Sequence, residues 1–190
     1  ISSETYHYSL FATLQSLGQA HTSLSNFALA RDACSESLQL AWDIALSTNG
    51  ANAASPKGKN ESVPNVIKAL KRLGKSFLLE KHYTSALECF LPSLELLRSS
   101  QEQNESLDCA SVLGSLGFLY LKLKKFTESS NFLRECLRLY QINGVDPNDR
   151  ETRKIQAWLQ MAESREEEDG ATPPPFLEIP TIVFHDEQGI

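Results

Sequence analysis

Four cationic side chains stand close together near the middle of the chain: Lys68, Lys71, Arg72 and Lys75. Spacings of three and four residues place the lysines on one face of a helix, with the arginine beside them. Cations this close repel each other unless something neutralises them. Residues 57–82 carry seven basic and two acidic side chains, whereas the 190-residue chain has a net charge of −6. This pattern predicts a site for an acidic peptide. The alternatives are a solvated basic face that has no partner and a site for nucleic acid or anionic lipid.

Three further side chains have chemistry suited to peptide recognition. Gln15 and Gln19 carry amides that could hydrogen-bond an extended peptide backbone. Phe118 could offer an exposed apolar contact, although a ring at such a position can also pack against a neighbouring element. We therefore treat these three residues and the four cations as candidate peptide-binding residues.

Groups that carry out catalysis show no comparable arrangement. The histidines are scattered, at positions 7, 21, 82 and 185. The sequence has no nucleophile elbow, zinc-protease motif, glycine-rich phosphate loop or EF-hand. The acidic run 166–169 is a charge run and not a placed acid–base pair. We expect no enzyme, no cofactor and no metal site, with a regulatory domain of a larger enzyme as an alternative.

The cysteines indicate the compartment. Cys34, Cys89, Cys109 and Cys136 form no C-x-x-C pair and stand among apolar neighbours. We expect buried packing residues in a reducing, cytoplasmic compartment, with a disulfide or metal site as the alternative. No apolar run is long enough to span a membrane, and the acidic balance argues against general nucleic-acid binding, so neither partner is expected.

A repeated pattern predicts the elements that position these side chains. Leu-Gly pairs at 17–18, 73–74 and 116–117 each follow a leucine by three residues and precede a ring by three. A small residue comes nine positions after each ring, and a larger one four positions later: Ala30 and Cys34, Ala86 and Phe90, Ser129 and Leu133. This recurrence favours a helix, a turn near residues 124–125 and a second helix, with the glycine allowing close approach.

The intervals between the glycines are 56 and 43 residues, so the first must contain an insertion. We predict one domain over 1–164, with repeats at 6–48, 64–100 and 106–143 and a capping helix at 151–164. Residues 49–63, rich in Gly, Ala, Ser and Asn, read as a surface loop, after which Pro64 fits the first turn of the next helix.

Over roughly residues 6–164 the pattern resembles the tetratricopeptide repeat family. The 43-residue interval and the linker at 144–152 are similar to the kinesin light chain type. The resemblance implies an all-α, right-handed superhelical solenoid of antiparallel helix pairs. It also implies that the first helices line a concave face that holds a protein or peptide partner.

The C-terminal segment changes character after residue 164. Residues 165–175 are charged and then proline-rich, which predicts an extended linker before an apolar stretch that begins at Phe176. From 163 to 190 there are eight acidic residues and one basic residue. We hypothesise that residues 176–187 dock on the solenoid of this chain or a neighbouring one; packing along the capping helix, or disorder, are the alternatives.

The combined prediction is an adaptor or scaffold that grips an extended, acidic partner segment. The resemblance to kinesin light chains suggests a link to motors or cargo. A structural self-assembly module without a groove ligand is a second possibility.

Overall fold

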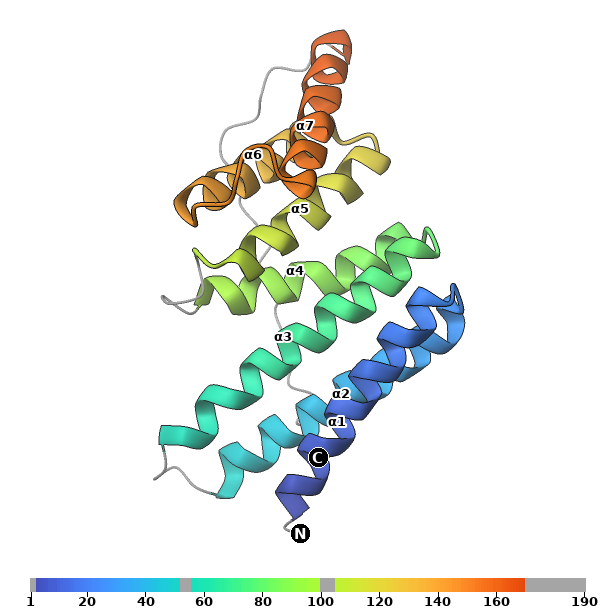
Figure 1. Cartoon of the computed structure of the whole chain (residues 1–190), viewed down its shortest axis with the longest axis vertical. Helices are drawn as coiled ribbons and strands as arrows, with labels where there is room; N and C mark the ends of the chain where they lie inside the picture. Colours follow the sequence, from blue (N-terminus) through green and yellow to red (C-terminus); the bar gives the residue numbers. More distant parts are fainter. Residues whose placement is uncertain (1–2, 52–55, 100–104, 170–190) are drawn as a thin grey trace, which may run out of the picture.

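The computed structural model describes residues 3–51, 56–99 and 105–169. Within these ranges the chain forms seven helices and no strand, stacked as antiparallel pairs with a single last helix (Figure 1). The helices are α1 Ser3–Ser23, α2 Phe27–Ala51, α3 Pro56–Leu79, α4 Tyr83–Ser99, α5 Leu107–Lys122, α6 Phe126–Ile142 and α7 Arg150–Asp169. The predicted all-α repeat solenoid is confirmed, while the handedness of its superhelix stays a prediction.

The three helix pairs share one kind of turn. A residue with positive φ follows each first helix: Ser25 (60°), Lys81 (64°) and Lys124 (60°). The next N–H donates to the carbonyl oxygen of the ring residue five positions earlier, as in Lys125 N to Tyr120 O at 2.9 Å. This bond satisfies a carbonyl that the end of the helix would leave free. The turn predicted near residues 124–125 is therefore confirmed, and it recurs at the equivalent place in each pair.

The repeated glycines lie where the two helices of a pair approach most closely. A Cβ atom added to Gly117 would lie 2.5 Å from Leu133 Cγ, and one added to Gly74 would lie 2.9 Å from Phe90 Cε2. At Gly18 the nearest atom would be Cys34 Sγ, at 2.8 Å. These are the partners that the repeat spacing pairs with each glycine. The predicted close contact is thus confirmed in all three pairs.

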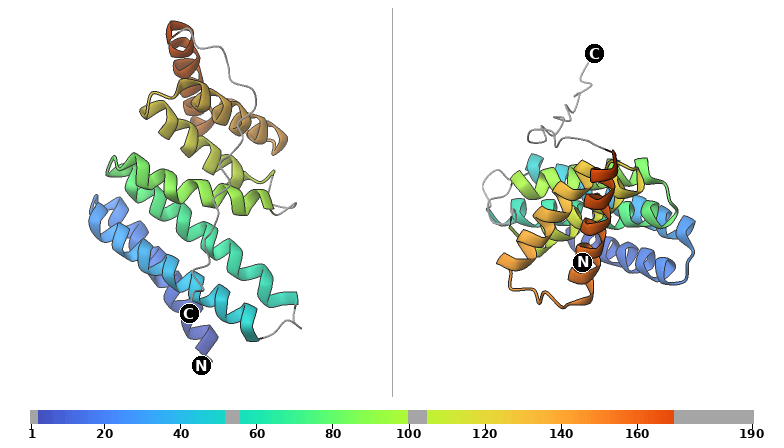
Figure 2. Two further views of the ribbon diagram at one scale, coloured as in Figure 1. Left: turned by 180° about the vertical axis from the view of Figure 1, so that it is seen from behind. Right: turned by 90° about the horizontal axis from the view of Figure 1, so that it is seen from above.

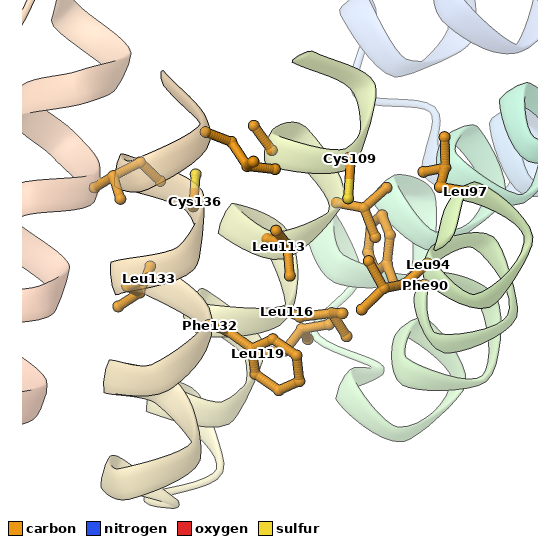
Figure 3. Close-up of a cluster of buried hydrophobic side chains, with 14 of the residues drawn as sticks. Phe90, Leu94, Leu97, Cys109, Leu113, Leu116, Leu119, Phe132, Leu133 and Cys136 are labelled. Atoms are coloured by element: carbon orange, nitrogen blue, oxygen red, sulfur yellow. The ribbon is translucent and has the colours of Figure 1, made fainter. Parts of the chain in front are cut away.

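The largest buried cluster lies among α4, α5 and α6 (Figure 3). Leu113, Leu116 and Leu119 of α5 are fully buried, with Leu94 of α4 on one side and Leu133 of α6 on the other. Two smaller clusters join the first pair to the second. The core is therefore a continuous series of contacts between neighbouring helices, as expected for a stack of repeats.

All four cysteines are free and buried within this core. Burial raises the pKa of the Cys89 and Cys136 thiols to about 12. The prediction of inert packing cysteines is confirmed.

The last helix takes the place of a fourth first helix. The residues 43 positions after the buried Cys109, Val112 and Leu119 of α5 are Thr152, Ile155 and Ala162, which are also buried. Ser130 Oγ of α6 donates to Glu166 Oε2 at 3.1 Å, so α7 is held against the preceding pair along its length. Figure 2 shows α7 at one end of the stack and α1 at the other.

Two predicted boundaries were wrong. Much of the predicted loop at 49–63 is helical, because α2 continues to Ala51 and α3 begins at Pro56, so Pro64 lies inside α3 and not in its first turn. Extending a packed helix costs far less than starting a new one, which explains how a composition typical of loops becomes helical. The predicted linker from 165 likewise begins as helix, since α7 continues through the glutamate-rich run to Asp169. The tail hypothesis for 176–187 lies outside the described residues.

Across the described ranges, no helix combines the length and the apolar character needed to cross a lipid bilayer.

Candidate functional site

Three neighbouring hollows run along α3, and Arg72 lines all of them. Their volumes are about 360, 580 and 350 Å³. The first extends over α5 and α7, the second toward the start of α3 and α5, and the third over the end of α1. We call them together the α3 groove. Because its walls come mainly from α1, α3, α5 and α7, the first helices line this surface, as the resemblance implied.

Each of the four predicted cations lines the α3 groove. Lys71 lines the first and second hollows, Lys75 the first and third, and Lys68 the second. The periodicity of the α-helix explains why all four side chains lie on the same surface. Successive turns of one helix place residues at i, i+3, i+4 and i+7 along a single stripe, and α3 presents that stripe outward while its opposite face packs on α2 and α4.

Two of these cations are already engaged and two are free. Lys71 Nζ pairs with Asp108 Oδ1 of α5. Arg72 Nη1 donates to the Gln15 carbonyl oxygen at 3.0 Å and to Gln19 Oε1 at 2.9 Å. Lys68 and Lys75 are exposed and form no ion pair with any residue that the structure describes. The oxygens that hold Arg72 are neutral, so its charge, like those of Lys68 and Lys75 on either side of it, has no counter-charge among the described residues.

The structure corrects the placement of Gln15. Its side chain is 2% exposed, and its amide nitrogen donates to Ser37 Oγ at 2.7 Å. Ser37 is itself fully buried on α2, so this bond draws the Gln15 amide between α1 and α2 and away from the groove. The backbone of Gln15 still contributes, since its carbonyl oxygen holds Arg72 in place.

Gln19 lies where it was expected, on the wall of the third hollow. Its side-chain oxygen accepts from Arg72, which leaves the amide nitrogen as the group that can donate to a ligand.

Phe118 lines the first hollow together with Trp158, a residue that the sequence analysis did not single out as part of the site. The ring centroids lie 4.5 Å apart, so the half-buried Phe118 packs against the next repeat element and still faces the hollow. Lys122 Nζ lies 5.0 Å from the centroid of the Phe118 ring, and Lys154 Nζ lies 4.7 Å from that of Trp158. Two rings and two cations thus form one surface of mixed apolar and positive character.

The position of Trp158 could have been found from the sequence. Adding the repeat intervals to Arg72 leads to Ser115 on α5 and then to Trp158 on α7, so these three residues occupy equivalent places on successive first helices.

The remaining lining of the first hollow is nearly neutral and includes both apolar side chains, such as Leu78 and Ile155, and polar ones. Burial raises the pKa of Tyr140 to about 12, so its phenol stays protonated and can both donate and accept a hydrogen bond. Glu151 Oε2 accepts from Lys154 Nζ at 3.2 Å. Among the described residues no three His, Cys, Asp or Glu side chains come together as metal ligands. The arrangement can bind through charge, hydrogen bonds and apolar contact.

A comparison with protein families matches residues 110–143 to the tetratricopeptide repeat. This match covers most of α5 and all of α6, the best-packed pair of the stack. Repeats of this family are protein-interaction modules that use concave surfaces. No curated protein matches the chain.

Proposed function

We propose that the chain, which carries a tetratricopeptide repeat at 110–143, is an adaptor or scaffold that binds an extended, acidic segment of a partner protein along the α3 groove. One observation carries this proposal. Arg72 lines all three hollows, and the exposed Lys68 and Lys75 beside it have no ion-pair partner among the described residues. Cations without counter-charges along a continuous groove attract an anionic ligand.

The two ends of the groove suggest the order of side chains in such a ligand. Acidic residues of the partner would lie near Lys68 and Lys75, where the free charge is. An apolar residue would lie on Phe118 and Trp158, since their paired rings offer the largest apolar contact of the first hollow. The Gln19 amide nitrogen would donate to a backbone carbonyl between them.

The chain's own C-terminal segment has the chemistry of this ligand. Residues 176–187 combine an apolar run with acidic residues. Pro180 lies within this segment and three prolines at 173–175 precede it, which favours an extended conformation. We therefore include in the proposal that this segment competes for the α3 groove, in the same chain or a neighbouring one. The free, buried cysteines support a reducing compartment such as the cytoplasm. The long repeat interval supports a kinesin-light-chain-like role in linking cargo.

The test uses a fluorescent peptide that corresponds to residues 171–190. Its anisotropy is measured against the full chain at two salt concentrations. We expect saturable binding that weakens as salt screens the lysines. The double variant Lys68→Glu with Lys75→Glu should weaken binding at least tenfold at low salt, because each change replaces an attraction by a repulsion.

The matched control is Lys124→Glu with Arg153→Glu, which makes the same change of charge outside the three hollows. This control should bind nearly as well as the unaltered chain. Equal losses in both double variants would show a general effect of net charge and would overturn the assignment of the α3 groove. A scrambled peptide of the same composition distinguishes sequence recognition from simple charge attraction.

A further inference from the structure

Each inner first helix buries one apolar stripe against the second helix of the preceding pair. On α3 the stripe is Val66, Ala69, Leu73 and Ser76, and on α5 it is Cys109, Val112, Leu116 and Leu119. No member of either stripe is more than 7% exposed. Leu73, for example, lies in one buried cluster with Cys34 of α2, and Leu38 of α2 packs against that cluster. The stripe is therefore the interface by which one repeat stacks on another.

The same positions on α1 are open. Subtracting the repeat interval from the α3 stripe leads to Leu10, Thr13, Leu17 and Ala20. Leu10 is 36% exposed and Leu17 is 45% exposed, and both small residues are also exposed. Tyr6 and Leu24 continue the line at 61% and 69% exposure. We call these six residues, the last of which directly follows α1, the α1 stripe. Helix α1 lies at one end of the stack, where no helix of the described chain covers it (Figure 1).

The chemistry of the α1 stripe is that of an interface and not of a solvated helix. No Asp, Glu, Lys or Arg occurs between residues 5 and 30, so no residue of the stripe and no neighbour of it within that range carries a formal charge. Thr13 Oγ1 donates to the Ser9 carbonyl oxygen at 2.9 Å, which satisfies the hydroxyl and leaves the methyl group to make contact. An exposed apolar stripe of this length on α1 indicates a partner surface.

The stripe is complementary to itself. Leu10, Leu17 and Leu24 recur every seven residues, and so do Tyr6, Thr13 and Ala20. This is the spacing of two helices packed side by side. If a second α1 runs antiparallel, with the symmetry axis near position 15, Leu17 faces the small Thr13 of the other copy. Leu10 then faces Ala20, and Tyr6 faces Leu24. Two of these three pairs set a large residue against a small one, and each contact occurs twice, as a two-fold interface requires.

We propose that two copies of this chain associate through the α1 stripe, antiparallel and about a two-fold axis. The absence of formal charges favours a second copy as the partner, because two identical charged helices would repel each other across the axis. Association removes the exposed leucines from water without changing the fold of either copy. The α3 groove stays open on each copy, so the dimer would present two such grooves.

The first test is the mass of the full chain in solution, measured by sedimentation equilibrium over a range of concentrations. The unaltered chain should approach twice its 21.2 kDa mass. The double variant Leu10→Lys with Leu17→Lys should stay at the monomer mass over the same range, because it places four like charges at the axis. Met161→Lys is the control, since Met161 is 54% exposed on α7 at the other end of the stack, and it should behave like the unaltered chain.

Circular dichroism should show the same helix content for all three proteins, because both leucines are already open to water. A monomeric unaltered chain at the highest concentration, or a double variant that still forms dimers, would overturn the proposal. Peptide binding by the double variant is a separate readout, so failure of the α1 interface and failure of the α3 groove are distinguishable.

The second test checks the antiparallel arrangement by oxidative cross-linking. The four native thiols are buried, so an introduced cysteine on α1 is the accessible one. A mixture of Thr13→Cys and Leu17→Cys chains should form the mixed cross-link, because these positions face each other across the axis. Either variant alone should cross-link weakly. Strong cross-linking of Leu17→Cys with itself would indicate parallel helices and would contradict the arrangement.

Discussion

The two ends of the helical stack finish in opposite ways. The inner first helices turn a Leu, a Gly and a ring toward their second helix. At the equivalent positions of the repeat, α7 has Gln156, Gln160 and Glu163. The first two are exposed, so the face of α7 that would receive another helix is polar. On α1 the face toward a preceding helix keeps the apolar chemistry of an inner repeat. A few side chains on the outer face of a helix therefore decide whether another helix can stack on it.

The same comparison separates residues that are apolar because they form the core from residues that are apolar for contact with a partner. Leu17 and Leu116 occupy equivalent positions in the repeat, yet one is 45% exposed and the other is fully buried. Their sequence surroundings are nearly the same, so only their place in the stack distinguishes them.

The largest effect should come from truncating the stripe at an inner position. Leu116→Ala removes a fully buried side chain from the main cluster and should lower the free energy of unfolding by about 2–5 kcal/mol. Leu17→Ala should lower it by less than about 1 kcal/mol when measured at concentrations where the chain is monomeric. Urea unfolding followed by circular dichroism measures both. Equal losses would mean that the end of the stack is covered within one chain.

Filling the close contact within a pair should have the next largest effect. An added methyl group at Gly117 would meet Leu133 Cγ at 2.5 Å, so Gly117→Ala should cost about 1–3 kcal/mol despite alanine's better helix propensity. The equivalent residue on α7 is Gln160, which is exposed, and Gln160→Ala should change stability by less than about 0.5 kcal/mol. Thermal unfolding of the two variants gives the comparison. A neutral Gly117→Ala would show that α5 and α6 can separate without loss.

Alkaline pH should weaken the interior of the stack and not its ends, because α1 and α7 contain no cysteine. In the folded chain the pKa of Cys89 and of Cys136 is about 12, compared with an ordinary value of 9.0. Above pH 9 the unfolded chain loses these protons while the folded chain keeps them, so the free energy of unfolding falls as the pH rises. The fall is up to about 1.4 kcal/mol per thiol for each pH unit.

Denaturant unfolding at a series of pH values between 9 and 11 measures this dependence. Cys136→Ala should be less sensitive to pH than the unaltered chain, because it removes one of the buried groups whose pKa is raised. A stability that rises over this range would contradict the burial of the thiols.

The smallest effect should come from the ion pair that fastens the polar end. Arg134 Nη2 and Glu163 Oε1 lie 2.9 Å apart, but both side chains are about half exposed. Glu163→Gln should therefore cost less than about 1 kcal/mol, and the difference should shrink at high salt. A loss much larger than this would show that α7 depends on charge rather than on Ile155 and Ala162 for its attachment.

Much of the fold could be predicted from recurrence alone. Three Leu-Gly pairs with equivalent partners specified the helix pairs, the close contacts and the turn, because each repeat solves the same packing problem. Loop composition misled the prediction at 49–63, since the stability of a long helix depends on its packed part and not only on local propensity. The groove was predicted from the cations, and the structure places all four along one surface.

Individual side chains of the site were harder to predict. Gln15 and Lys71 occupy equivalent positions, but Gln15 turns inward because Ser37 on α2 accepts its hydrogen bond. Trp158 joined the site because α7 stacks on α5 in the same register as α5 on α3. Neither outcome depends on the spacing within one helix, so neither could be read from that spacing.

Residue types and their spacing are enough to specify the repeat, the residues at its close contacts, the cluster of cations and the uncharged stretch from 5 to 30. The open apolar stripe, the cations that lack a counter-charge and the ring pair that faces the groove are properties of the stacked helices. Those properties depend on what lies across from each side chain. A residue's burial and electrostatic environment are set by neighbours that are distant along the chain, and Leu17, Lys75 and Phe118 acquire their roles only when the helices stack.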